Sequence, residues 1–455
     1  MIELDVEYES DSLVLVLDGV SKDNFDFFYR NEYLPNLQNY FAGRSTGTVI
    51  SEFPSLTGAS HCGFLGLEEP SGYEASRFLR SKNRMHNTYP RNIILRDILG
   101  IETPSSIAGQ YDFHKGTLRH VFAFMNPEAS ARADSHKLRR HVSKFKHDHN
   151  SVWILSTDEL THRNGRAGLG YALKEFDAVF MDVVKHLRPK ELLIFSDHGN
   201  HTTDERLERS YLEDTVQDAG FTLSRTIRNE RDVVLPSFGM ISFAALYTNS
   251  SNIPELSDVL LENKKVDFIA YVNKDHNITV EAVRGKAHVE CKVDMLDMEA
   301  RKVPLKFRYE VVNGQDPLGY QTIIAGLLDE GYGDEQGFVA EKSLFATTMN
   351  HKYPNALRRL HGAFFQNGSP GDILVSLRNG YYNGRKNLEK LVDVYSTHGN
   401  LTREASTGFS LYTGPQELPS SSMIYELNSF SKEPNPIKRG LRALYQKITD
   451  SFKRK

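Results

Sequence analysis

The chain has 455 residues, of which 39% are hydrophobic and 25% are charged, with a formal net charge of −4. These values are those of an ordinary globular protein, and they exclude the strongly basic character of a nucleic-acid-binding chain. No apolar run approaches the roughly 18–20 residues that cross a bilayer, and the acidic N-terminus lacks the segments of a secretion signal, so we expect a cytoplasmic protein.

The first strong pattern is the apolar run LVLVL at residues 13–17, which ends at Asp18 and Gly19. A continuous apolar run is typical of a parallel strand that is buried on both faces. Ligands in open α/β sheets bind at the carboxyl ends of the strands, so Asp18 is well placed for chemistry. Apolar residues at helical spacing then predict a helix over residues 24–42.

Thr57 lies in the segment FPSLTGASH (53–61), between a predicted strand at 46–53 and a helix-like run at 59–67. The first backbone N–H groups of a helix are unpaired, and the helix dipole favours anions there. A hydroxyl at this place can attack a phosphorus atom while those donors hold the phosphate oxygens. A threonine before a helix is, however, usually only an N-cap.

Residues 105–109 and 120–125 have the apolar character of further strands. The segment 132–149 is rich in Arg, Lys and His, and we favour a solvated helix face over a polyanion-binding patch.

Two more apolar runs, 152–156 and 192–196, also lead into acidic residues. The first continues to Asp158 and His162, and the second ends at Asp197 and His198. A helix is predicted between them, over 168–187. Together with the run before Asp18, these strands are expected to bring their carboxylates to one edge of the same sheet.

The pattern changes after a predicted helix at 204–219. Residues 266–312 alternate with period two, which predicts a small antiparallel sheet, and helices follow near 317–329 and 338–361. Strands at 372–377 and 410–414 then resume the α/β pattern. We therefore expect an α/β fold whose central, mostly parallel sheet is flanked by helices and built from residues 1–261 and 362–435, with 262–361 inserted as an α+β cap.

The tail, residues 436–455, is basic, and its apolar residues fall on one helical stripe. Docking of this helix on the protein itself is the favoured interpretation. The alternative is contact with an anionic membrane surface.

Six side chains with nitrogen or oxygen ligands follow predicted strands or lie in the loops after them, and the Thr57 hydroxyl adds a seventh ligand. The six are Asp18, Asp158, His162, Asp197, His198 and His398. Asp and His ligands suit Zn²⁺ best, with Mn²⁺ as the alternative. The set is large enough for two divalent cations, which can clamp the attacking and leaving oxygens of a phosphoryl transfer.

The segment FPSLTGASH, preceded by Leu-Asp-Gly and followed in order by Asp-(three)-His, Asp-His-Gly and Thr-His-Gly, resembles the alkaline phosphatase superfamily. Within it, the type I phosphodiesterases and nucleotide pyrophosphatases are the most similar branch, over roughly residues 10–250 and 370–415. The resemblance implies an alkaline phosphatase-like fold and a Thr57 nucleophile that forms a phosphothreonine, which water then hydrolyses. It also implies one metal held by Asp18, Thr57, Asp197 and His198, and another held by Asp158, His162 and His398.

One position departs from the pattern of the phosphodiesterases. They usually have Asn just before the histidine of the nucleophile segment, where Ser60 stands here. Phosphate binding is then expected to shift to Ser60, to backbone N–H groups near Gly58, or to a basic residue such as Arg403, for which a surface ion pair is the alternative.

The function expected from these residues is hydrolysis of a phosphodiester, pyrophosphate or phosphomonoester bond in a small phosphorylated substrate. A phosphomutase or phosphoryl transferase with the same ligands is one alternative, because a cap over residues 262–360 can exclude water. A non-catalytic binding module on the same scaffold is the other. The sequence does not distinguish a nucleotide, a sugar phosphate and a lipid head group as the substrate.

Overall fold

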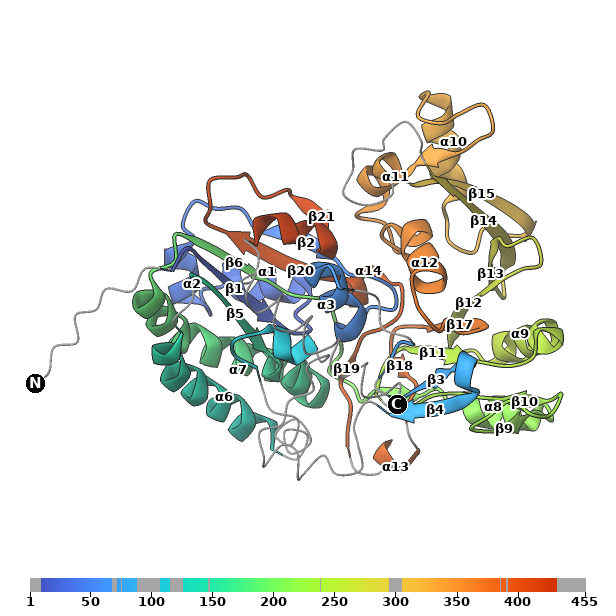
Figure 1. Ribbon diagram of the computed structural model, residues 1–455, viewed down its shortest axis with the longest axis horizontal. Coiled ribbons are helices and arrows are strands. Elements are labelled where there is room, and N and C mark those ends of the chain that lie inside the picture. Colours follow the sequence, from blue (N-terminus) through green and yellow to red (C-terminus); the bar gives the residue numbers. More distant parts are fainter. Residues whose placement is uncertain are drawn as a thin grey trace, which may run out of the picture.

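A computed structural model describes most of the chain. The described residues are 10–67, 72–74, 76–87, 107–114, 126–145, 148–237, 239–293, 305–384, 386–389 and 392–431. They form two sheets that lie side by side, each with its own helices (Figure 1). In this part of the chain, no helix is both long and apolar enough to span a bilayer.

The first sheet has six strands in the order β21-β2-β20-β6-β1-β5. Their bounds are β1 Ser12–Leu17, β2 Gly47–Ile50, β5 His149–Ile154, β6 Glu191–Phe195, β20 Thr407–Tyr412 and β21 Ser421–Met423. β1 is parallel to β5 and β6, and β2 is parallel to β21, whereas β20 is antiparallel to both neighbours. The predicted α/β fold with a mostly parallel central sheet is therefore confirmed.

Helices cover both faces of this sheet. One face carries α1 Lys22–Arg30, α2 Pro35–Tyr40, α6 Pro127–His141 and α7 Ser156–Leu187. The other carries α3 Thr57–Leu65 and the 3-10 helix Ile424–Phe430. Successive side chains of a strand point to opposite faces, so Leu13, Leu15 and Leu17 pack in the first layer, and Val14 and Val16 pack in the second. This two-sided burial explains the continuous apolar run before Asp18.

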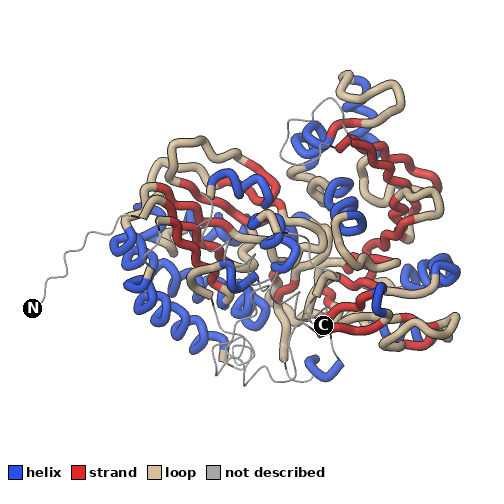
Figure 2. Tube along the Cα trace, viewed as in Figure 1, coloured by secondary structure: helices blue, strands red, loops and turns tan. Residues whose placement is uncertain are grey.

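The second sheet has seven strands in the order β11-β17-β12-β13-β14-β15-β16, and every neighbouring pair is antiparallel. Figure 2 draws strands in red, with those of the second sheet on the right of the molecule and those of the first sheet on the left. The bounds are β11 Phe243–Leu246, β12 Val266–Val272, β13 Ile278–Ala282, β14 Gly285–Val293, β15 Leu305–Gly314, β16 Val339–Ala340 and β17 Ile373–Leu377. Its helices are α8 Leu212–Asp218, α9 Ile253–Glu262, α10 Gln321–Asp329, α11 Glu341–Thr348 and α12 Ala356–Phe365.

The remaining elements are short. They are β3 Ser76–Leu79 with β4 Arg84–Asn87, β7 His201–Thr202 with β19 Ser396–Thr397, β8 Glu208–Arg209 with β18 Tyr381–Tyr382, β9 Thr222–Leu223 with β10 Asp232–Val233, α13 Lys386–Glu389 and α14 Arg403–Ser406.

Several sequence predictions need correction. The strand predicted at 372–377 exists as β17, but it belongs to the second sheet rather than to the first. β17 is buried on both faces, between two separate core clusters, and such burial produces the same apolar run in an antiparallel sheet. The second sheet thus includes strands outside residues 262–361. That this segment is a cap of its own stays a prediction.

Other differences are local. Residues 107–109 of the strand predicted at 105–109 lie in a 3-10 helix over Ile107–Gln110. The helix predicted over 24–42 is divided into α1 and α2. The helix predicted over 204–219 begins only at Leu212. The strand predicted at 120–125 and the basic tail 436–455 lie outside the described residues.

The segment before Thr57 lies at the junction of the two sheets. Phe53 and Leu56 pack in the core of the second sheet, whereas Phe64 of α3 packs against the first sheet. α3 accordingly lies between the two groups of strands in Figure 1. Sites between structural units are frequent places for ligands to bind.

Candidate metal centre

All seven predicted ligands come to one region, at the carboxyl ends of strands of the first sheet. Asp18 follows β1, Asp197 and His198 follow β6, and Asp158 and His162 lie in the first turns of α7 after β5. Thr57 begins α3 after β2, and His398 follows β19. They form two clusters, Asp18 with Asp197 and His198, and Asp158 with His162 and His398, in each of which the ligand atoms lie within 4.8 Å of one another.

In the first cluster, His198 Nε2 lies 3.4 Å from both Asp18 Oδ1 and Asp197 Oδ2. Thr57 Oγ1 lies 3.2 Å from His198 Nε2 and 3.4 Å from Asp18 Oδ1. The two carboxylates and the imidazole are fully buried. The threonine hydroxyl therefore shares its surroundings with three buried side chains that could hold a metal ion.

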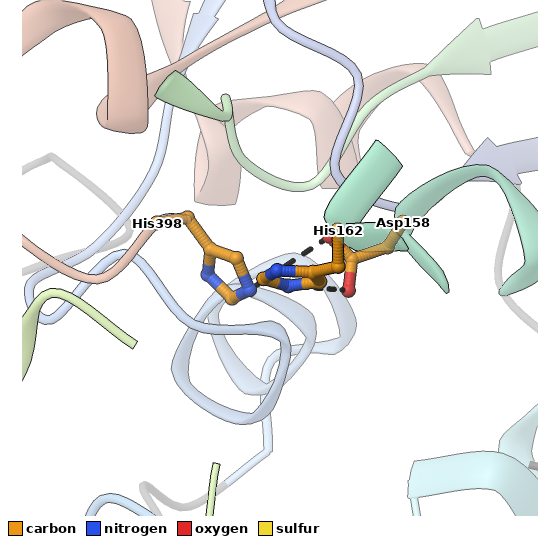
Figure 3. Close-up of side chains that lie close together, drawn as sticks. All are labelled: Asp158, His162 and His398. Carbon is orange, nitrogen blue, oxygen red and sulfur yellow. Dashed lines mark ion pairs between the residues drawn. The ribbon is translucent and has the colours of Figure 1, made fainter. Parts of the chain in front are cut away.

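In the second cluster, Asp158 lies between two imidazoles. Its Oδ2 is 3.3 Å from His162 Nε2, and its Oδ1 is 3.8 Å from His398 Nε2. Figure 3 shows the two rings converging on this carboxylate from different segments of the chain. The rings of His198 and His398 are stacked with centroids 4.0 Å apart, so the two clusters adjoin.

Backbone carbonyl groups fix the orientation of all three histidines. The Nδ1 atoms of His162, His198 and His398 lie 2.6, 2.9 and 2.7 Å from the carbonyl oxygens of Ser396, Gly199 and Ser55. A carbonyl oxygen can only accept a hydrogen bond, so each Nδ1 carries a proton. A neutral ring then presents the lone pair of Nε2 to its cluster, as metal-binding histidines do.

The charges of the clusters also fit cations. Burial, and then the charge of Asp197, raise the pKa of Asp18 to about 7, because buried carboxylates repel one another. Burial and the neighbouring His198 lower the pKa of His398 to about 3, so this imidazole is neutral and its Nε2 lone pair is available. Burial alone would lower the pKa of His198, but the charges of Asp197 and Asp18 raise it to about 10, so these buried carboxylates stabilise positive charge in the first cluster. Carboxylates converging with imidazoles are the donor set of zinc sites.

The structure argues against Thr57 as a simple N-cap. Leu56 is the N-cap of α3, and Thr57 is the first residue of the helix. Among the described residues, none accepts a hydrogen bond from the backbone N–H of Gly58. A Cβ at Gly58 would meet nothing within 4 Å, so there is open space beside this donor. The N-terminus of α3 is thus open to an anion.

Three aromatic side chains support the first cluster, and the sequence patterns did not identify them. Trp153 Nε1 donates to Asp18 Oδ2 at 2.8 Å, and His61 Nε2 lies 3.2 Å from Asp197 Oδ2. Tyr111 Oη lies 2.7 Å from His61 Nδ1. The presence of His61 in the nucleophile segment was the one signal available for this role.

Two further contacts position Asp158, the carboxylate of the second cluster. Asn200 Nδ2 donates to Asp158 Oδ1 at 3.0 Å. Gly19 has a φ of +64°, and a Cβ there would overlap the Asp158 carboxylate. α7 is non-helical at Gly165, so its first turns, which carry Asp158 and His162, are set apart from the part that covers the sheet.

The predicted substrate-binding residues lie in different surroundings. Ser60 is fully buried in α3, and its Oγ has no hydrogen-bond partner among the described residues. The guanidinium of Arg403 forms an ion pair with Asp23, whose Oδ1 is 3.4 Å from Nη2, and no recorded contact joins it to either cluster. This ion pair is the alternative weighed from the sequence, and phosphate binding by Arg403 stays a prediction.

No family model and no curated protein matches the chain. Among solved structures, an inactive variant of murine ectonucleotide pyrophosphatase/phosphodiesterase 5 in complex with AMP is 12% identical, with a TM-score of 0.48, and the match covers 92% of this chain and 93% of that one. The human protein of the same name is 11% identical, with a TM-score of 0.47 and coverage of 92% and 93%. Phosphonoacetate hydrolase from Sinorhizobium meliloti 1021, in complex with phosphonoacetate, is 12% identical, with a TM-score of 0.49 and coverage of 93% and 95%.

Proposed function

We propose that this protein is a metal-dependent hydrolase of phosphoric esters in which Thr57 is the nucleophile. The observation that carries the proposal is the position of Thr57 Oγ1, 3.2 Å from His198 Nε2 and 3.4 Å from Asp18 Oδ1 at the start of a helix. A hydroxyl among metal ligands and beside unpaired helix donors is placed to attack a phosphoryl group.

The residues fit two divalent cations, Zn²⁺ by donor chemistry and Mn²⁺ as the alternative. Asp18, Thr57, Asp197 and His198 would hold one cation, and Asp158, His162 and His398 the other. Bound cations lower the pKa of the nucleophile hydroxyl and neutralise charge that develops on the phosphoryl oxygens.

The chain's own groups then perform two displacements. Thr57 Oγ loses its proton and forms a bond to phosphorus as the bond between phosphorus and the leaving oxygen breaks, and the leaving oxygen takes up a proton. The helix donors beginning at Gly58 bind the non-bridging oxygens. Water attacks the resulting phosphothreonine, the bond from Oγ to phosphorus breaks, and the hydroxyl regains its proton. The substrate is a small phosphorylated molecule with a diester, pyrophosphate or monoester bond.

Turnover of a chromogenic aryl phosphodiester and the matching monoester, with added Zn²⁺ or Mn²⁺, tests the proposal. We expect Thr57→Ala to abolish turnover and Thr57→Ser, which keeps a hydroxyl, to retain a measurable fraction of it. Unchanged turnover in Thr57→Ala would refute the nucleophile. Isomerisation of labelled sugar phosphates without release of phosphate would instead identify a phosphomutase.

A further inference from the structure

Arg359 is a fully buried arginine on α12, in the part of the molecule built around the second sheet. Its guanidinium donates to four backbone carbonyls and two hydroxyls. The acceptors are Ser51 O at 2.8 Å, Glu52 O at 3.3 Å, Pro354 O at 3.2 Å, Leu401 O at 3.3 Å, Ser55 Oγ at 2.8 Å and Ser406 Oγ at 2.8 Å. Arginine is rarely buried so completely, and the removal of such a group leaves its acceptors unsatisfied.

The acceptors of Arg359 belong mainly to two segments that carry the candidate site. Ser51, Glu52 and Ser55 precede Thr57, and Leu401 and Ser406 follow His398. One side chain from α12 therefore holds the nucleophile segment against the segment that supplies a ligand to the second cluster.

The two segments meet at Ser51, whose N–H donates to Ser406 O at 2.9 Å, and at Ser55. The N–H of Ser55 donates to Gly399 O at 3.2 Å, and its Oγ donates to Asn400 O at 3.0 Å while it accepts from Arg359. Its carbonyl oxygen lies 2.7 Å from His398 Nδ1 and so fixes that ring. A shift of Ser55 would move both Thr57, two residues later, and the Nε2 atom that His398 presents to Asp158.

We propose that Arg359 is a positioning residue that sets the spacing between Thr57 and His398, and thereby the affinity of the second cluster for its cation. The inference rests on the proposed function. Arg359 lies outside both ligand clusters. It acts through Ser55 and touches neither cation nor substrate.

A neighbouring residue provides a matched control. Arg358 lies on the same helix and is only 2% exposed, but its Nε lies 3.3 Å from Glu341 Oε1 and its Nη1 lies 3.4 Å from Gln366 Oε1. Loss of Arg358 therefore removes a buried guanidinium and its attraction to Glu341 and Glu52, but leaves in place the hydrogen bonds of Arg359 to the backbone of the nucleophile segment. A purely structural role for Arg359 predicts that both substitutions act alike.

The experiment is a calorimetric titration of the chelator-treated full chain with Zn²⁺ alone, in the wild type, Arg359→Gln and Arg358→Gln. We expect one of the two binding steps to lose about 10–100-fold in affinity in Arg359→Gln, the range found when supports of metal ligands are removed. Arg358→Gln should bind Zn²⁺ like the wild type. Arg359→Lys keeps the charge but not the planar fork of donors, so its affinity for Zn²⁺ should lie between those of Arg359→Gln and Arg358→Gln.

If Arg359→Gln does not fold, Ser55→Ala decides the question, because it removes one contact of Arg359 and leaves the guanidinium in place. A loss of Zn²⁺ affinity and a fall in kcat with little change in KM would support the proposal. Wild-type affinity in Ser55→Ala, or equal losses in Arg358→Gln and Arg359→Gln, would overturn it. Fewer than two Zn²⁺ bound by the wild type would instead refute the two-cation function on which it rests.

Discussion

Replacement of Gly19 by alanine should disable the second cluster without replacing any of its candidate ligands. Gly19 has a φ of +64°, and its absent Cβ would overlap the Asp158 carboxylate. An alanine in this left-handed region costs about 1–2 kcal/mol of folding free energy by itself. The clash adds a displacement of Asp158, whose oxygens face His162 and His398 at 3.3 and 3.8 Å.

Gly43→Ala is the matched control for Gly19→Ala. Gly43 has a φ of +76°, but a Cβ there would meet nothing within 4 Å, so this variant carries the backbone strain alone. Urea unfolding should show a loss of about 1–2 kcal/mol in both variants. Zn²⁺ titration should show about 10–100-fold weaker binding in Gly19→Ala only. Equal Zn²⁺ affinities in the two variants would refute the placement of Asp158 against Gly19.

Three further predictions follow from the structure. Trp153→Phe removes the indole N–H that binds Asp18 Oδ2 at 2.8 Å, so we expect about 10-fold weaker turnover at limiting Zn²⁺, and wild-type kinetics would contradict this support role. Zn²⁺ at about 100 times its Kd should stabilise the fold by about 2.7 kcal/mol, and a rise in Tm measures this gain. A Tm that chelator does not change would refute the prediction. Burial and then Arg358 lower the pKa of His361 to about 4, whereas in the unfolded chain it stays near 6.5. The unfolded state therefore binds more protons between these values, and about 2–3 kcal/mol of stability should be lost as the pH falls from about 6.5 to 4. His361→Gln should remove that part of the pH dependence, and an unchanged slope in urea unfolding across this range would contradict it.

The candidate metal ligands could be predicted from the sequence where burial produces a continuous apolar run. Asp18 directly follows β1, and Asp197 follows β6 after one residue, Ser196. Both strands are buried on both faces, and their apolar runs mark where each strand ends. His398 follows a strand of only two residues, too short for any periodicity, so its prediction depended on the resemblance of the ordered motifs. β17 shows the limit of the same signal, because two-sided burial also occurs in the antiparallel sheet.

No sequence pattern predicts the residues that support the candidate ligands, such as Arg359 and Trp153. Arg359 binds the carbonyl of Ser51 across 308 positions of the chain, and its neighbour Arg358 has the same residue type and nearly the same burial but another set of contacts. Trp153 has the pattern of any strand residue, and its contact with Asp18 depends on the order in which β1 and β5 pair. Such roles are set by tertiary contacts, which no local pattern encodes.

The central claim is that Thr57 takes up the phosphoryl group. Rapid acid quenching of the Zn²⁺-loaded protein during turnover of an aryl phosphate, followed by peptide mass spectrometry, tests it directly. We predict a phosphorylated threonine at position 57 in the wild type and none in Thr57→Ala. Steady turnover with no phosphorylated peptide, or with the phosphoryl group on another residue, would contradict the account.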